Sequence, residues 1–409
     1  MPTALVLVRT TVTHDSRVLR EARLLRELGY EVLVAGIVSP AEQETELELD
    51  GVRVVRLVGP RRLGRRLLRR DSAARDEGSS RATATQDQWA TAGPSRLRRL
   101  LVALAFNLQG IVLAWRLSPD LVHANDYDTM WVGAAAKLLR GSRLVYDAHE
   151  LWPDRAGNPG WRPWLLACEA QFVRLADAII TVSPGLAAVI AARYRVPKPV
   201  VVRNVPERPR ELDPSPAPGA PVAVYSGALA PGRGIEEALR ALPSVPQLRL
   251  RLIGPDNDGF AAHIRDEAEA LGVADRLEIL PPVRPADVPA ALAGARMGLA
   301  LIRPSVLSYQ LSLPNKLFEY VAAGVPVLAS DLPVLGRTVQ EEGIGEVVPP
   351  GDVPAIAAAM RRLAEPARNA EARERVRSFG ERVNWQRERL VLEDVYARLP
   401  RRTRRTAAS

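Results

Sequence analysis

Lysine and cysteine are both scarce in this chain of 409 residues. Three of the 56 basic residues are lysines, at positions 137, 198 and 316, and the rest are arginines. The one cysteine, Cys168, excludes an intramolecular disulfide framework, and such cysteine usage is typical of a reducing cytosol. We therefore expect a cytoplasmic protein.

We also expect no signal peptide, no membrane span and no metal site. The first apolar run, residues 4–8, has no basic region before it and no cleavage-like site after it, so we expect a strand there and not a signal peptide. The longest uncharged run, residues 100–115, contains polar residues and is shorter than the roughly 20 residues of a membrane span, so we expect a helix packed on the protein. The sequence lacks the residue spacings typical of zinc and calcium sites, so we expect no metal site. It also lacks the Gly-x-Ser-x-Gly nucleophile elbow.

Composition and alternation indicate an α/β protein with two domains. Apolar residues make up 47% and charged residues 25%, the balance of a globular protein, and the length exceeds what one core usually covers. Short Val, Ile and Leu runs alternate with amphipathic helical segments, which favours parallel sheets covered by helices on both faces. We predict doubly wound domains over residues 1–205 and 222–385, joined by a proline-rich linker at 206–221. A helix at 386–400 that packs back toward the first domain and a basic tail at 401–409 follow.

Signals for individual elements are clear in several places. Asp15 or Ser16 is the expected N-cap of a first helix that ends at Gly29, and Ser183 followed by Pro184 starts another helix. Ligands of such sheets bind beyond the carboxyl ends of the strands. The expected strands are residues 4–8, 31–35, 52–57, 121–123, 144–146, 178–182 and 200–203, then 222–226, 248–253, 277–280, 297–302, 326–329 and 346–348.

Positive charge is concentrated in two segments of a chain whose formal net charge is +9. Residues 61–70 contain six arginines and residues 401–405 contain four. Leucines recur at helical spacing within 61–70, which suits an anionic membrane surface, although a solvated arm explains the same pattern. This segment belongs to an insertion at about 60–98, whose residues 71–95 lack hydrophobic content and are expected to form a surface loop. No aromatic interleaving accompanies the arginines, so we expect no nucleic-acid partner.

The stretch LPNKLFEYVAAGVPVLASD, residues 313–331, places Lys316 in the first turn of an expected helix. A lysine there opposes the helix dipole at a cost of about 0.3–1 kcal/mol unless an anion compensates it. The free N–H groups of the same turn favour a phosphate. Glu319 follows three residues later on the same face, where it can accept hydrogen bonds from ribose hydroxyls or simply pair with Lys316.

A second phosphate candidate is SGALAPGRGIEEAL, residues 226–239, which follows an expected strand and enters a helix after Gly234. A strand, a glycine turn and a helix form a phosphate-approach geometry, and Arg233 adds a charge that can bind in bidentate fashion. The segment matches neither a Walker loop nor the dinucleotide fingerprint, and an ordinary tight turn explains it as well.

These two stretches together resemble the donor domain of the retaining GT-B glycosyltransferases, specifically family four (glycosyl transferases group 1). HDSRVLREARLLRELGYEV, LVHANDYDT, LVYDAHELWPD, ADAIITVSPGLAAVI and NWQRERLVLEDVYARL resemble further landmarks of that family in the same order. The resemblance implies an α/β GT-B architecture, in which two doubly wound Rossmann-like domains face each other across a cleft. It also implies retaining sugar transfer from a UDP- or GDP-linked donor, without a metal or other cofactor.

Site residues follow from the same resemblance. Arg233 and Lys316 match phosphate-binding positions, Glu319 matches the ribose-binding glutamate, and His149 in DAHE resembles the active-site histidine. The implied catalytic residues are therefore His149, Arg233, Lys316 and Glu319. The implied donor-binding residues are Gly227, Gly232, Arg233, Gly234, Asn315, Lys316, Leu317 and Glu319. The acceptor-side candidates are His14, Asp15, His123 and Asp126.

Two positions depart from the family pattern. Leu311 stands where a first glutamate precedes Glu319, and Ala228 stands where an arginine often precedes Arg233. We expect a hexosyltransferase for a glycan or lipid-linked acceptor in cell-surface polysaccharide or glycoconjugate synthesis, peripheral on the inner membrane face through residues 61–70. The departures keep two alternatives open: a catalytically degenerate nucleotide-binding subunit and a GT-B-type nucleotide-sugar epimerase.

Overall fold

The computed structural model describes residues 1–13, 15–38, 44–57, 96–155, 160–207, 219–256 and 259–400. The expected basic arm, the loop at 71–95, His14, most of the linker and the basic tail lie outside the described residues. The chain divides into two compact units. One comprises Met1–Asp147, Leu175–Asp177 and Pro400–Ser409, and the other comprises Ala148–Arg174 and Ala178–Leu399.

The first sheet has eight strands in the order β3-β4-β2-β1-β5-β6-β7-β8. The strands β1 and β5 are neighbours, and the chain order reverses between them. The bounds are β1 Thr3–Leu7, β2 Glu31–Ile37, β3 Glu46–Leu49, β4 Val52–Leu57, β5 Leu121–Asn125, β6 Arg143–Ala148, β7 Ala178–Thr181 and β8 Val200–Val201.

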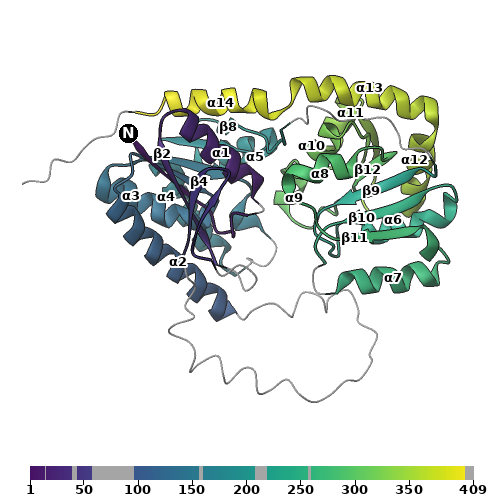
Figure 1. Cartoon of the computed structure of the whole chain (residues 1–409), viewed down its shortest axis with the longest axis horizontal. Coiled ribbons are helices and arrows are strands. Elements are labelled where there is room, and N and C mark those ends of the chain that lie inside the picture. Colours follow the sequence, from purple (N-terminus) through teal and green to yellow (C-terminus); the bar gives the residue numbers. More distant parts are fainter. Residues whose placement is uncertain are drawn as a thin grey trace, which may run out of the picture. The chain divides into compact units, whose positions relative to one another are not determined.

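The second sheet, as the described residues show it, has six strands in the order β11-β10-β9-β12-β13-β14, and all of its pairs are parallel. Figure 1 labels β9 to β12 of this sheet. Counted from β9 this is the doubly wound order 3-2-1-4-5-6, which reverses between β9 and β12. The order places the switch point, where such sheets bind ligands, beside the carboxyl end of β9. The bounds are β9 Val222–Ser226, β10 Arg249–Ile253, β11 Leu277–Leu280, β12 Met297–Ala300, β13 Val327–Ser330 and β14 Gly345–Val348.

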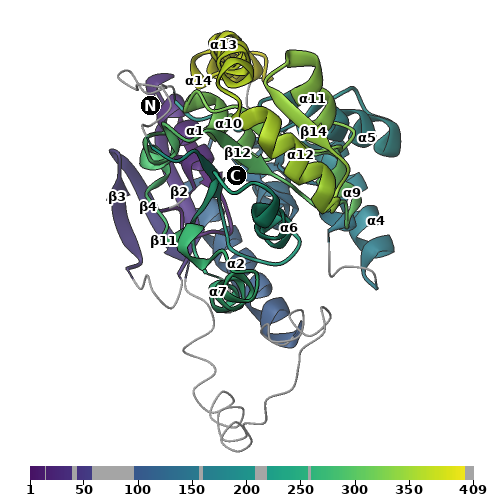
Figure 2. The same ribbon diagram turned by 90° about the vertical axis from the view of Figure 1, so that its right-hand side faces the viewer.

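Helices α6, α7 and α12 share one apolar core with the second sheet, and α6 lies beside α12 (Figure 2). The helices before the second sheet are α1 Ser16–Glu27, α2 Arg96–Leu117, α3 Met130–Arg140, α4 Arg162–Leu175 and α5 Pro184–Tyr194. Those after β9 are α6 Ile235–Ala241, α7 Phe260–Ala270, α8 Val288–Leu292, α9 Leu307–Leu311, α10 Asn315–Ala322, α11 Leu335–Glu342, α12 Val353–Ala364, α13 Pro366–Arg382 and α14 Trp385–Ala397. Single 3-10 turns are η2 Tyr127–Thr129, η3 Trp152–Asp154, η4 Leu242–Ser244, η5 Ala274–Arg276 and η6 Pro285–Asp287.

The expected helix starts are confirmed at two places. The Asp15 carboxylate accepts a hydrogen bond from the N–H of Val18, so Asp15 is the N-cap of α1. Ser183 caps α5 in the same way through the N–H of Leu186, with Pro184 at the first helical position. Both caps satisfy backbone donors that the first helical turn leaves free.

The hairpin of β3 and β4 was not expected from the sequence. The strand β3 pairs antiparallel with β4 at the sheet edge, and Asp50 and Gly51 join them with φ values of 52° and 75°. An Asp-Gly pair with two positive φ values is the preferred two-residue hairpin turn. The alternation of Glu and Leu in β3 suits an edge strand, and this signal together with Asp50-Gly51 was available in the sequence.

The helix expected at 100–115 is α2, but it is packed on one side only. Phe106 and Ala114 are buried, and Gly110 lies so close to α3 that a Cβ there would be 2.7 Å from Val132. The opposite side is exposed, and the window Leu100–Leu117 is 17% buried with a mean hydropathy of 1.7. The expected helix is therefore present and packed on the protein through one face, and its composition did not reveal that the other face is exposed.

Candidate nucleotide site at the switch point

The loop after β9 approaches its neighbours so closely that it requires glycine. Gly227 has a φ of +127°, and its carbonyl oxygen would lie 2.0 Å from a Cβ on Gly254. Gly234 has a φ of +78°, and a Cβ there would lie 2.1 Å from the carbonyl oxygen of Leu301. Gly232 has a φ of +76° and faces open space. The sequence Gly-Arg-Gly thus forms a tight turn between β9 and α6.

Lys316 is the second residue of α10, and its side chain is buried against the same loop. Its ammonium nitrogen lies 3.5 Å from the centre of the Tyr225 ring and has no hydrogen-bond partner among the described residues. A Cβ on Gly227 would be 3.6 Å from that nitrogen, so the glycine leaves the space in front of the lysine open. A buried, unpaired cation of this kind is costly unless a ligand supplies the missing anion.

Electrostatics and burial both act on Lys316. The pKa of Lys316 is lowered to about 7, chiefly by burial and also by the positive charge of Arg233, while the carboxylate of Glu319 partly opposes both effects. Burial also raises the pKa of the Tyr225 hydroxyl above its ordinary value, so Tyr225 is neutral beside the lysine. Near neutral pH, a small change in the surroundings of Lys316 is enough to change its charge.

Arg233 is half-buried at the tip of the loop. Its guanidinium carbon lies 5.3 Å from the centre of the Tyr309 ring, and it forms no hydrogen bond or ion pair with the described residues. The site therefore contains two basic groups, Arg233 and Lys316, that repel each other and one carboxylate, Glu319. That balance leaves positive charge available for an anion, as expected from the sequence.

Glu319 and Tyr320 fix α10 to the sheet. The carboxylate of Glu319 accepts a hydrogen bond of 3.1 Å from the hydroxyl of Ser226 at the end of β9. The Tyr320 hydroxyl accepts from the N–H of Ser226 at 3.1 Å and donates to the carbonyl of Leu299 at 3.0 Å. These bonds align the basic groups and the carboxylate at the switch point.

The other two donor-binding candidates of α10 lie in different surroundings. Asn315 is exposed, and its side-chain oxygen accepts a hydrogen bond of 3.0 Å from the amide of Asn204. Leu317 is fully buried, and its N–H donates to the carbonyl of Pro314 at 3.0 Å. Of these two residues, Asn315 presents its side chain to solvent and Leu317 does not.

Leu311, in place of the family's first glutamate, is used for packing within its unit. The carbonyl oxygen of Leu311 accepts a hydrogen bond of 2.6 Å from the Ser183 hydroxyl, and a Cβ on Gly185 would meet the Leu311 side chain at 3.4 Å. The nearby Ser308 hydroxyl is also occupied, because it accepts from the N–H of Leu151 at 3.3 Å.

The hydrogen bond between Leu151 and Ser308 also holds the loop of His149, the expected active-site histidine. Half-buried His149 lies two residues before Leu151, so its loop is fixed to α9 within the same unit. Asp154 fixes the other end of the loop by accepting from Arg162 at 2.9 Å and pairing with Arg193 at 2.6 Å. The structure thus holds the His149 loop at two points.

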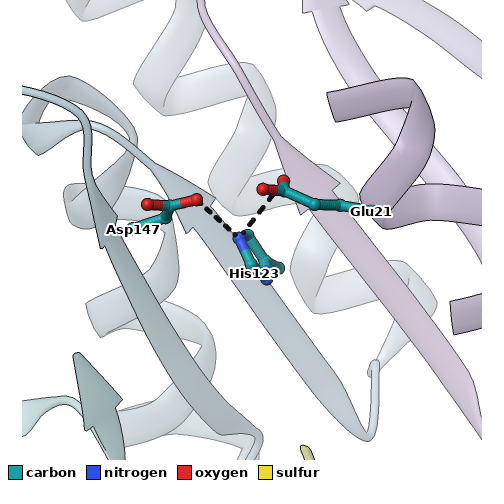
Figure 3. Close-up of side chains that lie close together, drawn as sticks. All are labelled: Glu21, His123 and Asp147. Carbon is teal, nitrogen blue, oxygen red and sulfur yellow. Dashed lines mark ion pairs between the residues drawn. The ribbon is translucent and has the colours of Figure 1, made fainter. Parts of the chain in front are cut away.

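Among the acceptor-side candidates of the other unit, His123 belongs to a buried charge cluster with Arg17, Glu21 and Asp147. The His123 imidazole is fully buried, with its Nε2 atom 3.4 Å from Glu21 and 3.5 Å from Asp147 (Figure 3). Arg17 donates to Asp147 at 2.8 Å and 2.6 Å and lies 2.9 Å from Glu21. The ligand atoms of Glu21, His123 and Asp147 lie close enough together to suit a metal ion, and Arg17 is an ion-pair partner of both carboxylates.

Sequence reasoning found His123 but missed its three partners. Arg17 and Glu21 are spaced four residues apart on α1, and this spacing was the available signal. Asp126 follows β5 with a φ of 64°, a conformation rare outside glycine, and its N–H donates to the carbonyl of Asp147 at 2.8 Å. Since His123 has no exposed surface, its acceptor-side role stays a prediction.

Comparison with known proteins identifies the class of enzyme to which the two halves of the chain are similar. A glycosyl transferase 4-like domain matches residues 14–206, and a glycosyl transferases group 1 domain matches residues 220–366. Together they match most of the chain, which is a glycosyltransferase with a group 1 domain in its second half. Its two Rossmann-like domains have the GT-B architecture expected from the sequence.

Particular relatives share this architecture over most of their length. The D-inositol 3-phosphate glycosyltransferase of Saccharomonospora viridis is 29% identical over 316 residues, which cover 68% of this chain and 69% of that protein. Sucrose-phosphate synthase from Thermosynechococcus elongatus matches with a TM-score of 0.73 at 19% identity and covers 97% of this chain and 99% of its own. The Anabaena protein Alr3699/HepE in complex with UDP-glucose matches with a TM-score of 0.69 at 15% identity, over 97% and 100% of the two chains.

Proposed function

We propose that this glycosyltransferase moves a hexose from a UDP- or GDP-linked donor to a glycan or lipid-linked acceptor, with retention of the anomeric configuration. The observation that carries the proposal is the placement of Arg233 and Lys316 beside Glu319 at the switch point of the second sheet. The complex of a structural neighbour with UDP-glucose supports a nucleotide-sugar donor.

The proposed mechanism depends on charge that develops on the leaving diphosphate. Groups that stabilise this charge more strongly in the transition state than in the ground state accelerate the reaction. Arg233 and Lys316 supply that positive charge, so we propose that no metal or other cofactor is required. Glu319 accepts hydrogen bonds from the ribose, and His149 lies beside the reacting sugar.

The proposed setting is the cytoplasm, at the inner face of the membrane, in the synthesis of cell-surface polysaccharide or glycoconjugate. His14, Asp15, His123 and Asp126 are the proposed acceptor side. The basic segment at 61–70 would bring the enzyme close to a lipid-linked acceptor through its six arginines.

One observation favours a second candidate, a nucleotide-binding subunit without turnover. Leu311 cannot hydrogen-bond a sugar hydroxyl through its side chain, and its carbonyl is bonded to Ser183. Calorimetric titration with UDP, GDP and their common sugar conjugates first identifies the donor. Release of nucleoside diphosphate that depends on acceptor then supports transfer, and tight donor binding without any such release supports the subunit.

His149 provides the matching variant for this experiment. In the proposed enzyme, His149→Ala lowers turnover more than it lowers nucleotide affinity, because the imidazole acts near the reacting sugar. Loss of nucleotide binding with unchanged turnover at saturating donor would contradict that role.

A further inference from the structure

The exposed side of α2 is an apolar stripe of large side chains, most of whose surface is not covered by the described residues. Its members are 47–58% exposed although all are large and apolar: Leu100, Leu101, Leu104, Leu108, Val112 and Trp115. Monomeric soluble proteins rarely present a contiguous apolar surface of this kind unless something binds there.

Helix geometry gathers the stripe on one side. With 3.6 residues per turn, five of these side chains, from Leu101 to Trp115, fall within an arc of about 80°. Phe106, Gly110 and Ala114 lie on the opposite side, where Gly110 allows the close approach of α3. The helix therefore has a packed face and an apolar outer face on opposite sides.

The helix that carries the stripe has basic residues and no acidic ones. Helix α2 contains arginines at positions 96, 98, 99 and 116, and α3 adds Arg140, whereas Lys137 of α3 is paired with Asp177 at 2.5 Å. The Arg140 guanidinium lies 3.6 Å above the Trp115 ring and donates to the Trp115 carbonyl at 2.8 Å, so basic charge meets the apolar stripe at one end. A helix with an apolar face and basic flanks is suited to the interface of an anionic bilayer.

We propose that the outer face of α2 binds the surface of an anionic phospholipid bilayer, with its leucines and Trp115 inserted at the level of the headgroups. A second copy of the chain fits less well, because a paired α2 would bring arginines of one copy toward arginines of the other. Although α2 is long enough to span a bilayer, its inner face packs on α3 through Gly110 and buries Phe106, so it lies on the surface.

This inference deepens the proposed function, since a lipid-linked acceptor lies in such a surface. Its test does not depend on sugar transfer, however. Binding to vesicles and binding of a nucleotide are separate measurements, so either proposal can fail while the other holds.

Sedimentation with vesicles of phosphatidylcholine alone, and of phosphatidylcholine with about one third phosphatidylglycerol, tests the proposal on the full chain. We expect binding to the anionic vesicles, and the double variant Leu104→Gln, Leu108→Gln to weaken it at least tenfold. The matched control is Leu390→Gln, Val391→Gln, which changes two exposed apolar residues of α14 and should bind as the wild type does. Far-UV circular dichroism spectra and thermal unfolding midpoints equal to those of the wild type show that both variants fold.

A second readout locates the contact. Brominated lipids should quench tryptophan fluorescence in the wild type, and Trp115→Phe should remove most of that quenching. The proposal is overturned if the wild type binds neither vesicle or if the α2 variant binds as well as the wild type. A wild-type dimer that the α2 variant dissociates, as measured by light scattering, would identify a second copy as the occupant and also overturn it.

Discussion

The ammonium nitrogen of Lys316 lies 3.5 Å from the centre of the Tyr225 ring. A cation over an aromatic face is stabilised by about 0.5–1 kcal/mol at exposed sites and about 2 kcal/mol or more when desolvated. This contact offsets part of the cost of burying the lysine without using any of its three N–H donors. All three remain available to phosphate oxygens.

Tyr225→Leu should therefore weaken nucleoside diphosphate binding by about tenfold, because it removes roughly 1–2 kcal/mol of cation–π stabilisation. Tyr225→Phe keeps the ring and loses only the hydrogen bond that the hydroxyl donates to Ala228 at 2.8 Å, so its loss should be smaller. Calorimetric titration of both variants makes the comparison. Equal affinities for the leucine and phenylalanine variants would show that the ring does not act on Lys316.

The charge state of Lys316 gives donor binding a pH dependence. Burial lowers the pKa of Lys316 to about 7 without ligand, and a bound diphosphate must raise the pKa because it adds negative charge. Binding above pH 7 is therefore accompanied by proton uptake, and affinity is greatest below pH 7 and falls as pH rises toward the pKa of the complex. The number of protons taken up follows from calorimetry at pH 8 in two buffers of different ionisation enthalpy. Lys316→Met should abolish the uptake, and equal uptake in this variant would assign the proton to another group.

Glu319 should distinguish a nucleotide from a bare diphosphate. If its carboxylate accepts ribose hydroxyls, Glu319→Ala loses hydrogen bonds to a charged group, each about 1.5–3 kcal/mol, with UDP or GDP. Binding of inorganic pyrophosphate, which has no ribose, should not weaken. A parallel loss for both ligands would mean that Glu319 acts only by pairing with Lys316 or by its bond to Ser226.

The buried charge cluster of the first unit should contribute strongly to stability. Arg17→Leu leaves Glu21 and Asp147 without their cation, and breaking such a buried pair costs about 3–5 kcal/mol of the free energy of unfolding. The control is Arg337→Leu, which breaks an exposed pair with Glu341 and should cost about 1 kcal/mol or less. Urea unfolding compares the two, and similar midpoints would contradict the importance of the cluster.

The sequence was sufficient to predict those features of the fold and the site that depend on residues close together in the chain. The caps of α1 and α5 and the strands of the second sheet follow from local patterns, as does a lysine that opposes a helix dipole. The Lys316 contact with Tyr225 could not be predicted, because it joins residues brought together by packing of α10 on β9. The exposed face of α2 was missed for a related reason: hydropathy measures preference for burial and not the presence of a partner.

The contact of the His149 loop with α9 could not be predicted from the sequence either. A serine and a backbone N–H far apart in the sequence, Ser308 and Leu151, carry no motif that links them. The Arg17 cluster similarly joins α1 to β5 and β6, and the spacing of four residues between Arg17 and Glu21 shows only the part within one helix.

Acceptor-dependent release of nucleoside diphosphate by Lys316→Ala, compared with wild type and with Lys198→Ala, tests the central claim most directly. Lys198 is exposed and lies outside the site, so it controls for the loss of a lysine. We predict that kcat/KM falls by about 10²–10³-fold in Lys316→Ala, equivalent to roughly 2.7–4 kcal/mol of transition-state stabilisation, and stays unchanged in Lys198→Ala. Wild-type kcat/KM in Lys316→Ala would contradict the assignment of this lysine to the leaving diphosphate.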